Sequence, residues 1–291
     1  MSLNSISLLG ISVTIDSKEE VLEYIRKRLE NVKGRKSKIR IKDRKPVIIY
    51  TPNPEIINQA KNDEDLKQIV NSAQIDLPDG SGVVWAIRKV FGIPIDRVAG
   101  VDFVQSLCAL ALKKRIRIGL IGGRGKIALK TRECLRKMHP RLGIEVLTAP
   151  EIRIWNKELG IKNTINSIPD SKFLILYSSG YKSKENKKYF DRLVREIKQK
   201  KISILFVAFG FPKQEIFIKL LSDRVKQSKR YHPLVLMAVG GAFDYIAGQV
   251  PRAPDWMREY GLEWLYRLIR EPRRLGRQIR GAQFFWDVYK I

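Results

Sequence analysis

Cysteine and histidine are scarce in this sequence of 291 residues, which contains two of each. Cys108 and Cys134 each lie in an apolar or helical run and do not indicate a disulfide framework, so we expect a reducing, cytoplasmic environment. His139 and His232 are far apart in the chain, and each is followed by proline. This scarcity argues against a histidine-rich metal site and against a histidine-based catalytic triad.

Long apolar segments are also absent from the sequence. No run of 18 apolar residues occurs, and the N-terminus lacks the basic start and long apolar core of a signal peptide. The sequence therefore predicts neither a membrane-spanning helix nor a signal peptide.

Acidic residues are few relative to basic ones. The chain has 30 Asp and Glu against 56 Lys and Arg, which gives a formal charge of +26. This charge predicts attraction to polyanions such as nucleic acid, anionic lipid headgroups or phosphorylated substrates, and it does not choose among them. Eight of the basic residues lie between Lys33 and Lys45, in a segment that we interpret as a solvated loop or an extended hairpin.

The hydrophobic pattern predicts an α/β protein of the Rossmann-like type, with a mostly parallel sheet and helices on both faces. Near-continuous apolar strands are expected over residues 47–51, 75–77, 115–123, 144–149, 173–179, 202–210 and 234–241. Amphipathic helices are expected between them, over residues 16–29, 82–91, 102–112, 126–138, 184–200 and 212–221. Ligands of such sheets bind beyond the carboxyl ends of the strands.

The composition changes near Ala253. The remaining chain has no strand signal and predicts two helices that are broken before Pro272. Six arginines and one acid lie between Trp264 and Gly281, and an aromatic tip, Phe284, Phe285 and Trp286, follows. Because this composition is typical of an interfacial membrane helix, we divide the chain into an α/β core, residues 1–252, and a membrane-associating helical appendage, residues 253–291.

Polar residues follow two of the expected strands. Thr51 and Asn53 lie in the segment TPNPE, where they either meet a polar ligand or form a turn with Asn as a helix cap. Asp79 lies in the glycine-rich turn of LPDGSGV, just before a helix. A helix cap and a catalytic carboxylate are about equally favoured for Asp79 by the sequence.

Glycine-rich turns follow three further strands. GLIGGRGK, residues 119–126, is neither a Walker motif nor G-x-G-x-x-G, and it is read as a diphosphate-binding turn or as a tight βα turn. Gln214 in FGFPKQE is expected in the first turn of a helix, within reach of a ligand. Asp244 in GGAFDYIAG either caps a helix or binds a ligand. The only D-x-D, residues 63–65, lies away from any strand end, so we expect no metal site there.

Seven segments stand in the order seen in one protein family: TPNPEIINQA, IDLPDGSGVVWA, DRVAGVDF, LIGG, FGFPKQE, GGAFDYIAGQVPRAPDWM and GLEWLYRLIREPRRL. From about Thr51 to Leu275 the chain resembles the WecG/TagA/CpsF bacterial glycosyltransferases. The resemblance implies transfer of N-acetylmannosamine, or a related sugar, from a UDP-sugar to a polyprenyl-diphosphate-linked N-acetylglucosamine. It further implies an enzyme attached peripherally to the inner face of the cell membrane, acting in teichoic-acid, common-antigen or capsule-like polysaccharide synthesis, with a UDP-sugar as substrate and no cofactor.

The resemblance also assigns roles to residues. It makes Asp79 the catalytic base and Thr51 and Gln214 further catalytic residues, and its substrate-binding positions are Asn53, Arg97, Arg267, Arg274 and Arg277. The other substrate-binding candidates come from their places at strand ends and helix starts: Asp102, Gly122, Gly123, Gly240 and Asp244. With no credible D-x-D, arginines are expected to stabilise the leaving diphosphate in a metal-independent, inverting displacement.

Three alternatives remain open at this stage. A nucleic-acid-binding protein would explain the charge, but no helix-turn-helix, RRM or zinc pattern occurs, so no specific nucleic-acid partner is expected. A nucleotide-dependent dehydrogenase lacks its fingerprint after residue 119. A non-catalytic membrane scaffold of the same fold is the third alternative. The sequence leaves the oligomeric state open, a homo-oligomer included.

Overall fold

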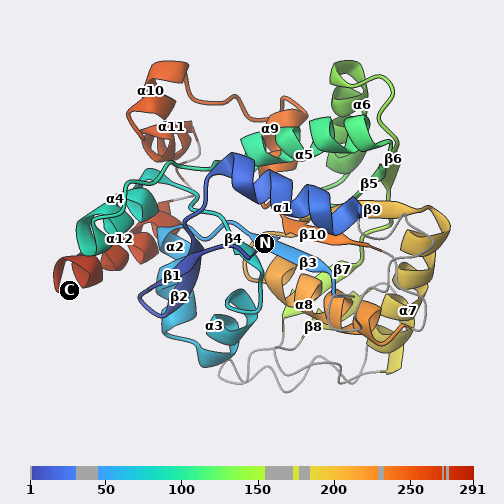
Figure 1. Ribbon diagram of the computed structural model, residues 1–291, viewed down its shortest axis with the longest axis horizontal. Coiled ribbons are helices and arrows are strands. Elements are labelled where there is room, and N and C mark those ends of the chain that lie inside the picture. Colours follow the sequence, from blue (N-terminus) through green and yellow to red (C-terminus); the bar gives the residue numbers. More distant parts are fainter. Residues whose placement is uncertain are drawn as a thin grey trace.

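A six-stranded sheet forms the centre of the computed structural model, which describes residues 2–30, 45–154, 173–176, 184–228, 233–270, 272 and 275–291 (Figure 1). All neighbouring strands in this sheet are parallel. In spatial order the strands are β4 (Ile75–Asp76), β3 (Val47–Tyr50), β10 (Val235–Ala238), β9 (Ile202–Ala208), β5 (Arg117–Gly122) and β6 (Ile144–Val146). The α/β class and the parallel sheet expected from the sequence are confirmed.

The central strands are apolar because both faces of the sheet are covered. Every residue of β3, β9 and β10 is buried. A strand that is buried on both faces has no reason to alternate polar and apolar residues. This burial explains why these strands appear in the sequence as continuous apolar runs.

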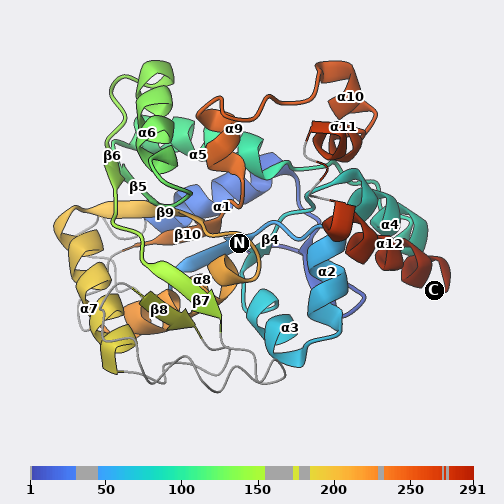
Figure 2. The same cartoon turned by 180° about the vertical axis from the view of Figure 1, so that it is seen from behind.

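Two groups of helices cover the sheet, one on each face (Figures 1 and 2). The apolar residues of one group form a core cluster with one face, and its helices are α1 (Lys18–Glu30), α5 (Gly100–Lys114), α6 (Ile127–Met138) and α9 (Ala242–Ile246). The second group packs in a separate cluster and contains α2 (Pro54–Lys61), α3 (Glu64–Val70), α4 (Ser81–Phe91), α7 (Lys184–Gln199) and α8 (Lys213–Lys226).

Two small sheets of the described residues lie outside the central one. An antiparallel hairpin, β1 (Ser5–Leu8) and β2 (Ile11–Thr14), was not expected from the sequence. The strand expected over residues 173–179 forms as β8 (Phe173–Leu176), but it pairs with β7 (Glu151–Ile154) and not with the central sheet. An apolar run predicts burial of a strand, but it does not identify the neighbouring strand. Residues 33–44 of the basic segment lie outside the described part of the chain.

Three helices end the chain: α10 (Asp255–Glu259), α11 (Glu263–Arg270) and α12 (Leu275–Tyr289). The last helix packs on α2 and α4, at the end of the molecule where the C-terminus lies (Figures 1 and 2). Phe284 and Val288 are fully buried in the same cluster as α2 and α4. The expected aromatic tip is therefore wrong for Phe284, because one face of this amphipathic helix docks on the core. Phe285 and Trp286 remain 43% and 61% exposed.

Helix α12 lies close to the start of α2. A β-carbon at Gly281 would be in ordinary van der Waals contact, 3.6 Å from the backbone nitrogen of Glu55. A salt bridge between Lys61 and Asp287 joins the same two helices further along. None of the helices in the described part of the chain has the length and apolar character needed to cross a bilayer.

Candidate active site

The residues singled out in the sequence gather at one edge of the central sheet. Because all six strands are parallel, their carboxyl ends lie on the same side of it. Thr51 directly follows β3, Asp79 comes shortly after β4, and Gly240 shortly after β10, while Gly122 ends β5. The parallel topology thus brings together side chains that are distant in the sequence.

Asp79 lies beside the start of α5 and does not cap α4. Gly80, with a φ of 102°, is the N-cap residue of α4, and no side chain of the described residues donates or accepts a capping hydrogen bond there. A β-carbon at Gly100 would lie 3.4 Å from Thr51 Cγ2 and 3.9 Å from Asp79 Oδ2. Thr51, Asp79 and the backbone of Gly100 therefore meet at one point, and the geometry does not support the helix-cap alternative.

The carboxyl group of Asp79 is more basic than that of an ordinary aspartate. Burial raises its pKa, while the Arg97 and Arg267 guanidiniums act in the opposite direction. The Arg97 Nη2 atom lies 3.8 Å from Asp79 Oδ1, and the Asp79 side chain is 28% exposed. Asp79 thus combines access from outside with a raised affinity for a proton, which are the properties required of a general base.

Glu263 holds two arginines of this site. Its side chain is 4% exposed, with Oε2 2.5 Å from Arg97 Nη2 and Oε1 2.5 Å from Arg267 Nη2. Burial raises the pKa of Glu263, but the Arg267 and Arg97 guanidiniums outweigh it and lower that pKa to about 2. Arg267 also lies 4.7 Å from the centre of the Tyr245 ring. Glu263 therefore connects the loop before α5 with α11.

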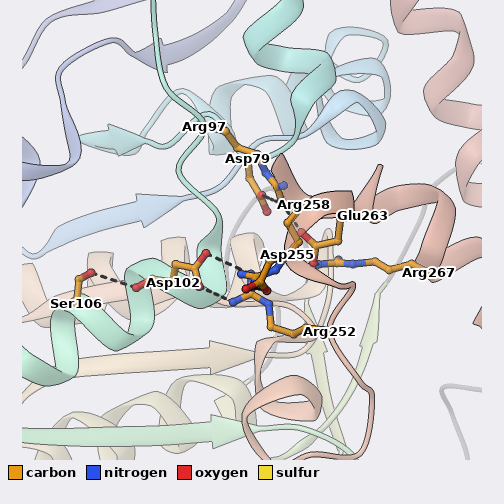
Figure 3. A network of polar contacts seen from close by, with 9 residues as sticks. All are labelled: Asp79, Arg97, Asp102, Ser106, Arg252, Asp255, Arg258, Glu263 and Arg267. Atoms are coloured by element: carbon orange, nitrogen blue, oxygen red, sulfur yellow. Dashed lines mark hydrogen bonds and ion pairs between the residues drawn. The ribbon is translucent and has the colours of Figure 1, made fainter. Parts of the chain in front are cut away.

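A further ion pair lies beside the contacts of Glu263 (Figure 3). Arg252 binds Asp102, at the start of α5, through two bonds of 2.5 and 3.2 Å. Arg258 pairs with Asp255 in α10. The buried Nε atoms of four arginines have no hydrogen-bond partner among the described residues: Arg97, Arg252, Arg258 and Arg267. Sequence reasoning missed Arg252 and Arg258, although both lie in or next to the QVPRAPDWM segment that carries the family resemblance.

The ionic network in Figure 3 contains equal numbers of positive and negative groups. Its four arginines are Arg97, Arg252, Arg258 and Arg267, and its four carboxylates are Asp79, Asp102, Asp255 and Glu263. A polyanionic ligand would therefore have to replace the carboxylates as acceptor of the guanidinium N–H groups, or accept hydrogen bonds from the unpartnered Nε–H groups. Asp102, expected to contact substrate, is in this structure the ion-pair partner of Arg252.

Gln214 connects two strand-end turns. Its Oε1 accepts hydrogen bonds from the backbone N–H groups of Gly210, at 3.2 Å, and Gly240, at 3.0 Å. Its Nε2 donates to Glu215 Oε1 at 3.0 Å, and the residue is only 4% exposed. These contacts give Gln214 and Gly240 a positioning function at the carboxyl ends of β9 and β10.

The Gly122–Gly123 turn packs tightly against β9. A β-carbon at Gly122, where φ is 100°, would lie 2.6 Å from the carbonyl oxygen of Ala208. The Gly123 N–H group donates to the same oxygen at 2.7 Å. Gly122 is therefore required for the βα turn itself, which was the alternative to a diphosphate-binding turn.

The remaining candidates lie at helix ends. Asn53 caps α2, because its Oδ1 accepts a hydrogen bond from Ile56 N–H at 2.9 Å. Asp244 lies in the short helix α9, where its Oδ2 would be 3.7 Å from a β-carbon at Gly241. Arg274 lies outside the described residues, and so does the side chain of Arg277 in α12.

The D-x-D of residues 63–65 forms a helix start. Asp63 caps α3 by accepting a hydrogen bond from Leu66 N–H at 3.0 Å. Within the described parts of the chain, no three His, Cys, Asp or Glu side chains are grouped so that they could hold a metal ion.

Comparison with known proteins places the chain in a family. Residues 6–291 match the profile described as "Glycosyl transferase WecG/TagA/CpsF family". An N-acetylglucosaminyldiphosphoundecaprenol N-acetyl-beta-D-mannosaminyltransferase from Bacillus spizizenii strain W23 is 30% identical over 247 residues, which cover 84% of this chain and 80% of the relative. With a match that spans nearly the whole sequence, the chain belongs to the WecG/TagA/CpsF family of glycosyltransferases.

Proposed function

We propose that this protein transfers N-acetylmannosamine, or a related hexosamine, from a UDP-sugar to N-acetylglucosamine carried on a polyprenyl diphosphate. The observation that carries the proposal is Asp79, whose pKa is raised at a partly open position between Thr51 and Arg97. The Bacillus spizizenii relative is named for mannosaminyl transfer to a diphosphoundecaprenol-linked N-acetylglucosamine. Family membership and the position of Asp79 support the same class of reaction.

Asp79 acts as the base in the proposed reaction. A sugar hydroxyl is a weak nucleophile at neutral pH, and a positioned carboxylate that accepts its proton accelerates attack by about 10²–10⁴-fold. The hydroxyl oxygen forms a bond to the anomeric carbon of the donor while the bond to UDP breaks. A single displacement of this kind inverts the configuration at the anomeric carbon.

Arginines stabilise the departing UDP in this proposal. Negative charge develops on the diphosphate as the glycosidic bond breaks, and guanidinium groups stabilise such charge through paired hydrogen bonds. Arg267, which the family resemblance assigns to substrate binding, and Arg252 are the candidates that we choose among the described residues. Like Arg97 and Arg258, each has a buried Nε without a hydrogen-bond partner among the described residues. We infer that their carboxylate partners, Asp102 and Glu263, hold them in place until the donor binds. No step of this mechanism requires a metal ion.

The same C-terminal region is proposed to attach the enzyme to the inner face of the cell membrane. Trp286 is 61% exposed, and Phe285, whose ring packs on Gly82 of α4, is 43% exposed. Lys290 lies 5.2 Å from the Trp286 ring centre. Aromatic and basic residues on one helix favour the boundary between lipid headgroups and acyl chains. This contact would bring the carboxyl edge of the sheet close to a lipid-linked acceptor.

A donor screen tests the proposed function. Purified protein is given UDP-N-acetylmannosamine, UDP-N-acetylglucosamine or UDP-glucose, together with a short-chain polyprenyl-diphosphate-N-acetylglucosamine. We expect UDP-N-acetylmannosamine to be used best, with a β-linked product from an α-linked donor. Transfer from none of the three donors, or retention of the anomeric configuration, would contradict the proposal.

A further inference from the structure

A cleft of about 610 Å³ separates α4 from the turn between α10 and α11. Its lining includes Trp85, Arg88, Lys89, Arg97, Arg258 and Tyr260. None of the sequence motifs predicted it, and only Arg97 belongs to the candidate active site as the sequence defined it.

The base of the cleft is a close contact between its two walls. Ser81, at the start of α4, donates a hydrogen bond from Oγ to the carbonyl oxygen of Gly261 at 3.0 Å. Gly261 has a φ of 71°, and a β-carbon there would lie 2.6 Å from Ser81 Cβ. The C-terminal segment is therefore held against α4 at this point.

The cleft carries positive charge that the protein does not neutralise. Arg88 donates to the carbonyl oxygen of Ile95, and the Lys89 ammonium lies over the rings of Trp85, at 5.3 Å, and Tyr289, at 4.2 Å. Neither cation forms a salt bridge with a carboxylate of the described residues. Glu259 is the one acid among the described residues of the lining. This contrasts with the balanced network around Glu263 and indicates a site for an anionic ligand.

Aromatic side chains continue the cleft toward the outside. The rings of Trp85 and Phe285 lie 5.6 Å apart, and Tyr289 shares the Lys89 ammonium with Trp85. Trp85, Phe285 and Tyr289 are all exposed. A cationic end beside an exposed aromatic surface suits a ligand that joins a phosphate group to an apolar chain.

Arg97 connects the cleft with Asp79. It lines the cleft, and its Nη2 lies 3.8 Å from Asp79 Oδ1. Strand β4, which precedes Asp79, is the edge strand of the sheet, whereas β10, β9 and β5 lie on the other side of β3. The cleft and the glycine-rich strand ends therefore flank Asp79 on different sides. A base between donor and acceptor requires this arrangement.

We propose that this cleft binds the lipid-linked acceptor, an inference that rests on the function proposed above. Arg88 and Lys89 bind the diphosphate, the attached sugar points along Arg97 toward Asp79, and the first isoprene units lie over Trp85, Phe285 and Tyr289. The donor occupies the strand ends on the other side of Asp79.

Two variants of the cleft test this placement against one matched control. Lys89→Glu reverses the charge at an exposed position of α4, and Trp85→Ala removes an exposed ring without opening a core cavity. Lys137→Glu makes the same charge reversal at an exposed position of α6, remote from the cleft (Figure 1). With a water-soluble short-chain acceptor, we expect each cleft variant to raise the acceptor KM by about tenfold or more. Lys89→Glu loses a hydrogen bond to a charged group, and Trp85→Ala loses apolar contact with the isoprene chain. The KM for the UDP-sugar stays unchanged, and Lys137→Glu resembles the wild type.

A binding measurement separates this proposal from the proposed function. Calorimetry with a short-chain prenyl diphosphate that lacks a sugar needs no catalysis, and prenyl alcohol and inorganic pyrophosphate serve as the two half-ligands. We expect the intact prenyl diphosphate to bind more tightly than either half, and Lys89→Glu to weaken it by about tenfold or more.

Each result has a defined meaning. If Lys89→Glu and Trp85→Ala both transfer sugar like the wild type with an unchanged acceptor KM, the cleft is not the acceptor site. The proposed function would then remain intact. Prenyl-diphosphate binding that depends on Lys89, in a protein that transfers no sugar, supports the cleft and overturns the function. A rise in the KM for the UDP-sugar alone assigns the cleft to the donor. Loss of vesicle binding with an unchanged KM for the soluble acceptor assigns Lys89 to the membrane surface. Each of these last two results rejects the proposal that the cleft binds the acceptor.

Discussion

Arg97 and Glu263 are separated by 166 residues in the sequence, and their side chains bind each other at 2.5 Å. The pair joins the loop before α5 to the first residue of α11, so the C-terminal helices help to position the arginine nearest Asp79. The basicity of Asp79 therefore depends on both parts of the chain, because Arg97 and Arg267 oppose the effect of burial on its pKa.

Asp79→Asn tests the base directly. The amide cannot accept a proton at neutral pH, so we expect kcat to fall by about 10²–10⁴-fold, while the Kd for UDP stays near the wild-type value. Steady-state kinetics and UDP calorimetry measure the two quantities. Asp96→Asn, an exposed aspartate in the loop before Arg97, is the matched control and should leave kcat unchanged. Near-normal turnover in Asp79→Asn would assign the base to another residue.

The acid limb of the pH–rate profile, where the rate falls as Asp79 becomes protonated, reports on Arg97. The raised pKa of Asp79 places this limb above the ordinary aspartate value of about 3.9. Arg97 lowers the Asp79 pKa, so Arg97→Met should move the limb to higher pH, and Arg97→Lys, which keeps the charge, should move it less. The position of the limb in kcat/KM, which reports the free enzyme, is the readout from pH 4 to 9, whatever the absolute rate. A limb that stays in place or moves down in Arg97→Met would show that Arg97 does not tune the base.

The sequence predicted the central sheet well because of burial. Strands such as β9 are covered on both faces, and they are therefore continuous apolar runs with glycines at their ends. The hairpin β1–β2 was missed because its two-residue turn is Leu9–Gly10, which lacks the Asn-Gly or Asp-Gly signal of such turns. Local patterns identified elements, and they failed where tertiary contacts determined the pairing, as for β8.

The site was predicted only in part, for a related reason. Asp79 and Thr51 are marked by turns that follow strands, and the structure brings them together. Arg252 and Glu263 carry no local mark, because their partners Asp102 and Arg97 lie more than a hundred residues away in the sequence. Gln214 was expected to face a ligand, yet its amide is bonded to the turns around Gly210 and Gly240. Its role in catalysis remains a prediction.

Glu263 should stabilise the fold as well as the site. Its pKa falls from 4.5 to about 2 on folding, so its contribution is present above pH 4.5 and is lost as the pH falls from 4.5 toward 2. The shift corresponds to about 3 kcal/mol, similar to the cost of breaking a buried ion pair. We expect Glu263→Ala to lower the free energy of unfolding by about that amount at pH 7 and by little at pH 2, as measured by urea unfolding. Glu263→Gln keeps two hydrogen-bonding groups and should lose less, whereas equal stability of Glu263→Ala and wild type at pH 7 would contradict the ion-pair assignment.

Glu215 should give the free energy of unfolding the opposite dependence on pH. Its side chain is 1% exposed, and Oε2 has no hydrogen-bond partner among the described residues. Burial raises its pKa to about 7, against the hydrogen bond from Gln214. The folded protein thus holds a proton between pH 4.5 and 7 that the unfolded chain releases, so its stability falls across this window, by about 3 kcal/mol, and stays low above pH 7.

Glu215→Gln removes this titration and keeps an oxygen that accepts from Gln214. We expect the variant to be more stable than wild type at pH 8 by up to about 3 kcal/mol, with the difference disappearing toward pH 4. Urea unfolding at several pH values measures it, and Glu133→Gln, at an exposed position of α6, is the control that should show no such trend. A wild-type protein that gains stability between pH 5 and 7 relative to Glu215→Gln would contradict the assignment.

Neighbouring aromatic residues on α12 should separate folding from membrane binding. Phe284 is fully buried against α2 and α4, so Phe284→Ala should cost about 3–5 kcal/mol of unfolding free energy. Trp286 is 61% exposed, so Trp286→Ala should leave the unfolding free energy within about 0.5 kcal/mol of wild type. The same change should weaken binding to phosphatidylglycerol vesicles by about tenfold, because the ring no longer inserts into the lipid interface. Urea unfolding and vesicle sedimentation give the two readouts for each variant. If Trp286→Ala bound vesicles like the wild type, this face of α12 would not be the membrane contact, and the exposed rings would have to be explained by the acceptor cleft alone.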